Sequence, residues 1–258
     1  MNTEGRHAYI VELVLHQGSV TIEELSEKLL ISEMTARRDL TELDRRGLLK
    51  RVRGGAVSNL GRSYEPPFLT RASKNQAAKE KIGAKAAEFI FDGNSVVLDS
   101  GTTVMEIVPW LKEKHNLTVV TNCLKTAARI TNLLALESDA RLILTGGVVR
   151  PNELSMVGPL SEPVLNSLHV DVAFIGIGGI HVDEGLTEFN LEDAQTKKKL
   201  LNAAGQKIVV ADGSKFGVTA FASVGPFSQI DRIITDESAP AGMIEKIRKQ
   251  GVDVVVVD

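Results

Sequence analysis

Cysteine is scarce in this chain, and long apolar runs are missing from it. Cys123 is the one cysteine among 258 residues, which excludes an internal disulfide. No apolar run approaches the roughly 20 residues that a membrane-spanning helix needs. The first 18 residues could be taken for a signal sequence, but charged residues and histidines interrupt them throughout. We therefore expect a cytoplasmic protein that does not contact a membrane.

Metal ligands are also few. The five histidines show no metal-ligand spacing among themselves or with Cys123. We expect neither a metal nor a cofactor. With 43% hydrophobic residues and a formal net charge of −3, the chain otherwise has the composition of an ordinary globular protein with a buried core.

Positive charge is concentrated in one short region of this slightly acidic chain. Residues 34–57 contain seven Lys or Arg and three Asp or Glu, a local excess of four positive charges. A pair of arginines on a helix is most simply a solvated face, so the surrounding elements must decide whether these side chains have a function.

Three helices are predicted around this region. Apolar residues at helical spacing predict the first over residues 4–17. Thr21 followed by Glu24 has the form of a capping box, which predicts the start of the second. After a short break, Ser32 can cap a third helix that runs to about Arg46.

The third helix divides into an inner and an outer face. Its inner face is an apolar stripe at helical spacing, made by Ala36, Leu40 and Leu43. A rotation of about 100° per residue places Arg38 and Arg45 nearly opposite this stripe, with Thr35 and Arg37 on its flanks. Two helices joined by a short turn, the second exposing Thr and Arg near its start, are typical of a helix that enters the DNA major groove.

A small hairpin is expected next, over about residues 48–56. Arg51 and Arg53 would project from one of its sides, and Gly54-Gly55 would turn the chain. Such a hairpin is a wing. Together with the caps and the turn length, it favours DNA binding over a merely solvated helix face.

Residues 6–56 resemble the winged helix-turn-helix of the DeoR family of bacterial sugar-metabolism repressors. The likeness includes an S-x-x-T-x-R-R-D-L motif beginning at Ser32 and a closing G-G-A. It implies that Thr35, Arg37 and Arg38 contact DNA, while Asp39 orients a neighbouring arginine. The full set of expected DNA contacts is Ser32, Thr35, Arg37, Arg38, Arg45, Arg51 and Arg53.

The domain organisation follows from a change of pattern. Residues 1–57 form the predicted DNA-binding domain, with the helix-turn-helix at about 20–46. Residues 58–75 contain two consecutive prolines and lack periodicity, which predicts a stiffened linker. Residues 76–258 form the predicted effector domain.

Short β-branched runs alternate with helical stretches throughout the predicted effector domain. Seven strands are expected, over residues 95–99, 117–121, 141–146, 170–178, 207–212, 232–235 and 252–258. Apolar strands that alternate with helices predict a parallel sheet covered on both faces, in a Rossmann-like α/β domain. Pro109 should kink or end the helix that follows the first of these strands.

Loops at the carboxyl ends of these strands are the candidate ligand site, because helix N-termini present free amides there. The loop Asp99–Thr103 combines one glycine with three hydroxyls and favours phosphate binding. Lys215 lies in another such loop and could pair with a phosphate. The glycines near Gly178 do not have dinucleotide-binding spacing, because His181 stands where the third glycine would be. The run Lys197–Lys199 is interpreted as a solvated helix face.

The family resemblance extends through this half in the segments "LDSGTT", "VVTN", "LTGG", "VDVAFIGIGGI", "GLT" and "VVADGSKFG". It implies a fold similar to ribose-5-phosphate isomerase and a phosphorylated sugar or related metabolite as effector. The effector contacts that it implies are Ser100, Gly101, Thr102, Thr103, Thr121, Asn122, Gly146, Gly178 and Lys215.

The leading hypothesis is a repressor of a carbohydrate-utilisation operon, which binds double-stranded operator DNA as a dimer or tetramer and responds to a metabolite. The alternative is a sugar-phosphate isomerase with a DNA-binding head, in which Asp99, Glu192 or Asp212 acts as the base and Lys215 as an electrostatic stabiliser. A redox sensor that binds a nicotinamide cofactor is a third hypothesis, which the broken glycine spacing disfavours.

Overall fold

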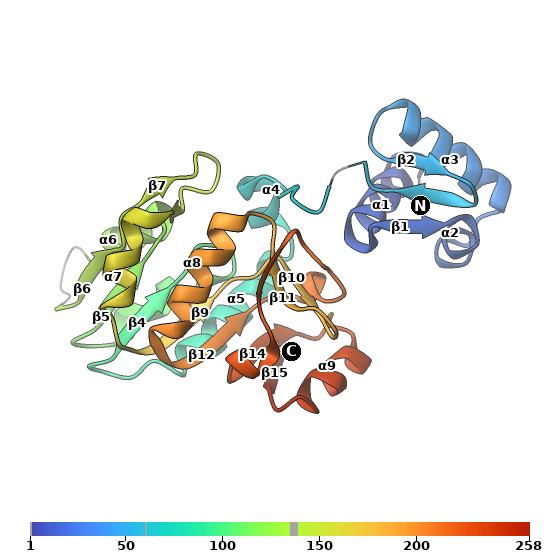
Figure 1. Ribbon diagram of the computed structural model, residues 1–258. Helices are drawn as coiled ribbons and strands as arrows, with labels where there is room; N and C mark the ends of the chain where they lie inside the picture. Colours follow the sequence, from blue (N-terminus) through green and yellow to red (C-terminus); the bar gives the residue numbers. More distant parts are fainter. Residues whose placement is uncertain (1, 60, 135–138) are drawn as a thin grey trace. The chain divides into compact units, whose positions relative to one another are not determined.

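The computed structural model describes residues 2–59, 61–134 and 139–258. It divides the chain into two compact units, residues 1–64 and 65–258, coloured along the sequence in Figure 1. The expected linker, 58–75, is therefore shortened: residues 65–75 belong to the second unit, and residue 60 lies outside the described residues. Among the helices of the described residues, we find none with both the length and the apolar character to span a membrane.

The first unit contains the three expected helices, α1 (Thr3–Gln17), α2 (Ile22–Leu29) and α3 (Glu33–Arg45). Their apolar stripes meet in one small core together with residues of the wing. Its buried members are Ile10, Val14, Val20, Ile22, Leu25, Ala36, Leu40, Leu43, Leu49 and Ala56. The inner face predicted for α3 is therefore confirmed.

Both predicted helix caps form. The Thr21 hydroxyl accepts the backbone N–H of Glu24 at 3.0 Å, at the start of α2. The Ser32 hydroxyl accepts the backbone N–H of Thr35 at 3.2 Å, at the start of α3. Between them, Leu30 ends α2 in the left-handed region with φ 51°. Because each cap satisfies an otherwise free amide, the direction in which α3 leaves the turn is fixed locally.

The wing is a hairpin of β2 (Lys50–Val52) and β3 (Gly55–Val57), and β1 (Ser19–Thr21) extends it to three strands in the order β1-β3-β2. The turn lies at Arg53-Gly54, one residue earlier than expected. Gly54 has φ 87°, which suits glycine in a tight turn, whereas the next glycine pairs with Val52 in the ladder.

A seven-stranded sheet with all its neighbouring pairs parallel forms the centre of the second unit, as predicted. Its order is β15-β14-β12-β9-β4-β5-β6. The strands are β4 (Ser95–Leu98), β5 (Thr118–Thr121), β6 (Arg141–Leu144), β9 (Val170–Ile175), β12 (Ala204–Val210), β14 (Arg232–Asp236) and β15 (Asp253–Val257).

The strand order reverses between β4 and β9. From β4 the chain continues outward through β5 to β6, and from β9 it continues in the other direction through β12 to β14 and β15. Ligands of such sheets bind outside the carboxyl ends of the strands where the order reverses. Asp99 follows β4 and Gly176 follows β9, so these residues mark the place.

Helices cover both faces of the sheet because successive strand residues point to opposite sides. Val172 and Phe174 of β9 pack in one core with α5 (Gln76–Ala87), the segment η1 (Val104–Glu113) and α6 (Leu124–Leu134). Ala173 and Ile175 of the same strand pack in the other, with helices of the opposite face. These are α7 (Glu162–Asn166), α8 (Leu191–Asn202) and α9 (Ala241–Arg248).

Pro109 lies inside η1 and does not end it. The whole segment is a 3₁₀-helix. Proline lacks the N–H that both α-helical and 3₁₀ hydrogen bonds need, so it costs the segment one backbone hydrogen bond.

Several short elements were not expected from the sequence. A second sheet contains β10 (Gly179–His181), β11 (Gly185–Glu188) and β13 (Ala222–Gly225), all antiparallel. A hairpin of β7 (Val148–Val149) and β8 (Met156–Val157) follows β6. The remaining short helices are α4 (Phe68–Ser73), η2 (Pro159–Ser161), η3 (Gly213–Lys215) and η4 (Phe227–Gln229). These segments are too short for hydrophobic periodicity to reveal.

Candidate functional site

The outward face of α3 presents the residues expected to contact DNA. Arg38 is exposed, and within the described part of the chain its side chain has no hydrogen-bond or ion-pair partner. Arg37 is exposed and pairs with Glu33 at 3.0 Å, one helical turn away. Ser32 is exposed, and its hydroxyl lies 2.9 Å from that of the partly exposed Thr35. Surface pairs of this kind are weak and can be exchanged for another anion.

Asp39 lies on the buried side of α3 and ties this helix to α1. Its carboxylate accepts the Arg6 Nε–H at 2.6 Å and lies 3.0 Å from His7 Nε2. Burial alone would raise the pKa of Asp39, but the hydrogen bonds from Arg6 and His7 hold it below its ordinary value. The arginine that Asp39 holds is therefore on α1, which leaves Arg38 free on the opposite side.

The other three expected DNA contacts are exposed as well. Arg45 makes two hydrogen bonds to the Glu42 carboxylate, at 2.9 and 2.7 Å. Arg51 lies in β2, whereas Arg53 lies in the turn. The ladder ends at Val52, so Arg53 belongs to the turn of the hairpin and not to strand β2.

A pocket in the second unit lies where the order of strands reverses. Its lining includes six of the nine expected effector contacts: Ser100, Gly101, Thr102, Thr103, Gly178 and Lys215. The loop after β4 supplies the first four. A Cβ at Gly178 would lie 2.7 Å from Glu188 Oε1 and 3.0 Å from the Phe189 ring, so a larger residue there would have to displace these two side chains.

Thr121, Asn122 and Gly146 do not line this pocket. Thr121 ends β5, Asn122 follows it, and Gly146 comes after β6. These strands lie one and two places beyond β4, and the hairpin β7–β8 is hydrogen-bonded to the end of β5. Thr121 Oγ1 accepts the backbone N–H of Cys123 at 3.2 Å, and the Asn122 carbonyl accepts that of Met156 at 2.6 Å. The sequence pattern treated all strand ends alike, but the pocket is lined from the ends of β4, β9 and β12 and not from those of β5 and β6.

A buried ion cluster forms one wall of the pocket. The Lys197 Nζ lies 2.5 Å from Asp99 Oδ2, 3.5 Å from Glu188 Oε2 and 3.6 Å from Asp193 Oδ2. Burial alone would lower the pKa of Lys197, but the carboxylates of Asp193, Asp99 and Glu188 raise it above its ordinary value. Burial raises the pKa of Glu188 to about 7, against the opposing attraction of Lys197. One ammonium thus holds three carboxylates that could not otherwise be buried together.

The interpretation of Lys197–Lys199 as one solvated face is wrong for its first member. Lys197 is buried, whereas Lys198 is exposed and Lys199 pairs with Glu162 at 2.6 Å. The three side chains point in different directions because a helix advances by about 100° per residue. Asp193 lies four residues before Lys197, so the two side chains share one face of the helix and can pair. This spacing was the signal in the sequence that could have separated Lys197 from the two lysines after it.

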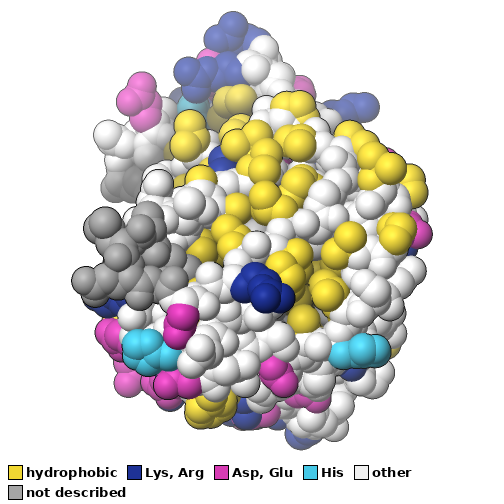
Figure 2. Space-filling model, turned by 90° about the vertical axis from the view of Figure 1, so that its left-hand side faces the viewer, with side chains coloured by type: hydrophobic (Ala, Val, Ile, Leu, Met, Phe, Trp, Pro, Cys, Tyr) yellow, Lys and Arg dark blue, Asp and Glu magenta, His cyan; other side chains and the backbone are white. Residues whose placement is uncertain are grey.

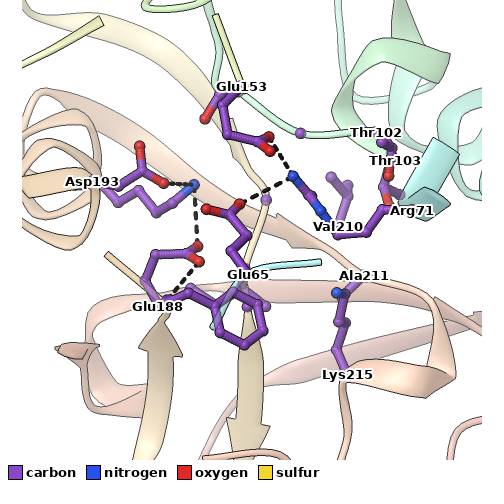
Figure 3. A pocket seen from close by; sticks show the side chains of 17 residues that line it. Glu65, Arg71, Thr102, Thr103, Glu153, Glu188, Asp193, Val210, Ala211 and Lys215 are labelled. Carbon is purple, nitrogen blue, oxygen red and sulfur yellow. Dashed lines mark hydrogen bonds and ion pairs between the residues drawn. The ribbon is translucent and has the colours of Figure 1, made fainter. Parts of the chain in front are cut away.

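A second group of charges lies beside this cluster, and the sequence patterns missed it entirely. Arg71 Nη2 lies 3.0 Å from Glu65 Oε1, and Arg71 also contacts Glu153. Arg150 contacts Glu65 as well, and its Nη1 lies 3.5 Å from Asp193 Oδ2. Figure 3 shows the carboxylates of Glu65 and Glu153 meeting at the guanidinium of Arg71.

Lys215 lines the same pocket from the strand-end loop after β12. Burial lowers the pKa of its ammonium, against the opposing attraction of Asp212. Asp212 accepts the backbone N–H of Ser214 at 3.0 Å and a side-chain amide N–H of Asn75 at 2.9 Å. Burial therefore disfavours the charge of Lys215, and Asp212, whose attraction favours it, also accepts hydrogen bonds from Ser214 and Asn75.

The candidate bases of the isomerase hypothesis do not line the pocket. Asp99 is fully buried behind it against Lys197, Glu192 is exposed on the first turn of α8, and Asp212 is buried beside η3. The segment after Gly178 forms strand β10, whereas a dinucleotide-binding motif would begin a helix there.

The raised pKa of Glu188 predicts how stability changes with pH. Its ordinary value is 4.5, so between pH 4.5 and about 7 the folded protein binds more protons than the unfolded chain. The free energy of unfolding should therefore fall as the pH rises through this window, by up to about 3 kcal/mol.

Urea unfolding at pH 5.0 and 7.5 measures this dependence. Glu188→Gln removes the titrating group but keeps the shape, so its stability should change less between the two pH values. An equal pH dependence in both proteins would show that Glu188 does not titrate in this range.

Comparisons with known proteins agree with the two-unit organisation. Residues 6–61 match a family model described as a DeoR-like helix-turn-helix domain, and residues 74–237 match one described as a DeoR C terminal sensor domain.

Curated relatives match over almost the whole chain. A putative aga operon transcriptional repressor from Escherichia coli O157:H7 is 33% identical over 99% of this chain and 94% of its own length. The glycerol-3-phosphate regulon repressor of Escherichia coli K12 is 34% identical, over 95% of each chain. Among solved structures, ribose 5-phosphate isomerase A from Methanocaldococcus jannaschii is 17% identical with a TM-score of 0.41, over 55% of each chain.

Proposed function

Because the chain belongs to the DeoR family of transcriptional regulators, we propose that it is a repressor of a carbohydrate-utilisation operon controlled by a phosphorylated sugar or related metabolite. The observation that carries the DNA-binding half is the outward face of α3. Ser32 caps the start of this helix, and Arg38 is exposed in its first half, with no side-chain partner among the described residues. The proposal places its action in the cytoplasm, where operator DNA is found.

DNA reading follows from the chemistry of this face. In the proposal α3 enters the major groove, where Arg37 and Arg38 reach guanine edges or phosphates and Thr35 reaches a base. Ser32, at the helix N-terminus, is suited to a backbone phosphate. Arg45, Arg51 and Arg53 are exposed and add phosphate contacts from the helix end and the wing.

Effector binding is proposed at the pocket beside the β4–β9 reversal. Thr102 and Thr103 offer hydroxyls at its rim, and Gly101, with φ 131°, allows backbone to approach an anion. Lys215 adds an amino group to the lining, which an anionic ligand would hold in its charged form. A phosphate with an attached polyol suits this mixture of hydroxyls, amides and one ammonium.

A homo-oligomer, dimer or tetramer, would bring two DNA-binding units to two half-sites. One face of the second unit carries apolar side chains, visible in Figure 2, over the edge strand β6 and the neighbouring β7 and η2. Its exposed members include Leu144, Val148, Val149 and Leu160. Such a patch supports contact with a second copy. A ligand that favours one arrangement of the copies would then change operator affinity by linkage.

The decisive experiment joins both halves of the proposal. A duplex is first selected from a random DNA library by the full-length protein, and pentose, hexose and glycerol phosphates are then screened by thermal shift. A ligand at 100 times its Kd should add about 2.7 kcal/mol to the stability and should change the gel-shift affinity for the selected duplex. Lys215→Met should weaken this response, whereas Lys198→Met, an exposed lysine of the same unit, should not.

Two outcomes would contradict the proposal. Equal stabilisation by the dephosphorylated sugars would remove the anion site. Conversion of the screened phosphates to isomers by the purified protein would establish the isomerase hypothesis.

A further inference from the structure

Glu65 occupies an unusual position for an acidic residue. It is the first residue of the second unit, directly after the end of the DNA-binding unit, and its side chain lines the pocket. Each carboxylate oxygen has its own guanidinium: Oε1 lies 3.0 Å from Arg71 Nη2, and Oε2 contacts Arg150. The side chains of Glu65 and Arg71 are each only 15% exposed, so these contacts are largely shielded from water.

Two guanidiniums that converge on one carboxylate make a site for an anion. A phosphate monoester has more charge and more acceptor oxygens than a carboxylate, and arginine binds it with paired hydrogen bonds. The other cation of this wall, Lys197, already holds three carboxylates. Arg71 lines the pocket and Arg150 pairs with Glu65, so these are the guanidiniums that a ligand could recruit when Glu65 leaves. Arg71 would then keep Glu153, and Arg150 would keep Asp193.

We propose that Glu65 is an internal stand-in for the anionic group of the effector. The Glu65 carboxylate holds Arg71 and Arg150, and the phosphate of the ligand displaces it. This inference rests on the proposed function and adds to it a specific anion subsite and a route from the pocket to the DNA-binding unit.

The proposed route from the pocket to the DNA-binding unit is short because the helix that follows Glu65, α4, is held in place by other contacts. The Arg71 Nε–H donates to the Pro66 carbonyl at 2.9 Å, and the buried Phe68 packs under the Lys125 ammonium, 3.5 Å from its ring centroid. These contacts anchor α4 whether or not Glu65 is bound. Release of Glu65 thus frees only the segment before it, which leads to the DNA-binding unit. The two prolines at 66 and 67 limit movement of the segment after it.

Glu65→Gln tests the inference because it removes the charge and keeps the shape. Calorimetry on the full-length protein with inorganic phosphate should show binding about 10-fold tighter than wild type, since the competing charge is lost. The change in operator affinity produced by the best phosphate ester of the thermal-shift screen should be reduced, because the connecting segment is already released without ligand.

Two further variants make the result specific. Glu153→Gln also frees Arg71, but Glu153 lies in the β7–β8 hairpin, so phosphate should bind more tightly while the operator response to the ester persists. Glu113→Gln removes an exposed carboxylate away from the pocket and should change neither measurement.

The possible failures can be told apart. If Glu65→Gln bound phosphate and responded to the ester as the wild type does, the stand-in role of Glu65 would be overturned and the proposed function would stay intact. Loss of the operator response in Glu153→Gln as well would assign the effect to pocket charge and overturn the route through Glu65. If wild type and variants all bind the selected duplex but no phosphate compound, the effector site and the stand-in are both wrong.

Discussion

Arg38→Ala is expected to remove most of the operator affinity of the full-length protein. A well-placed arginine contributes about 1–3 kcal/mol to DNA binding, and a dimer on two half-sites would lose this twice. Gel-shift titration with the selected duplex should therefore show an affinity at least about 30-fold lower. The side chain is exposed, so the melting temperature should stay near that of wild type.

Salt dependence shows what Arg38 contacts. If it contacts a phosphate, the slope of log affinity against log salt concentration should decrease by about one per subunit, and all sequences should be bound more weakly. If it reads a base, selection with the variant should return a relaxed preference at one position of each half-site. Lys112→Ala removes one exposed positive charge from the second unit and serves as the control. An Arg38→Ala protein with unchanged affinity would show that α3 does not dock as proposed.

Lys197→Met is expected to have the largest effect on stability. Methionine nearly fills the same volume, but the substitution leaves Asp99, Glu188 and Asp193 buried without their shared cation. Removing one partner of a buried ionic group costs about 3–5 kcal/mol, because the remaining charges are uncompensated. Urea unfolding of the second-unit transition at pH 7.5 would measure the loss.

The neighbouring residue provides a matched control. Lys198→Met makes the same chemical change on the exposed side of the same helix and should alter stability by less than about 0.5 kcal/mol. Because burial raises the pKa of Asp99 and Glu188, protonation at pH 5 should restore part of the stability of Lys197→Met. If the two variants were equally stable at pH 7.5, the three carboxylates would not depend on Lys197.

Some features of the sites were within reach of the sequence. The caps at Thr21 and Ser32 and the outward position of Arg38 depend on residues three or four apart. The loop Ser100–Thr103 was placed correctly because it directly follows a buried strand. The order of the strands, which no local pattern reveals, leaves three expected contacts outside the pocket: Thr121, Asn122 and Gly146.

The sequence by itself determined the DNA-reading helix and the seven parallel strands, because caps, helical stripes and β-branched runs act between residues that are near neighbours along the chain. Tertiary structure alone decided which charged side chains meet at the pocket and behind it. Glu65 and Arg150 are 85 residues apart, and Asp99 and Lys197 are 98 apart. Ion pairs over such separations exist only after the chain has folded. Folding brings the charged groups together and removes the water that would otherwise solvate each one separately.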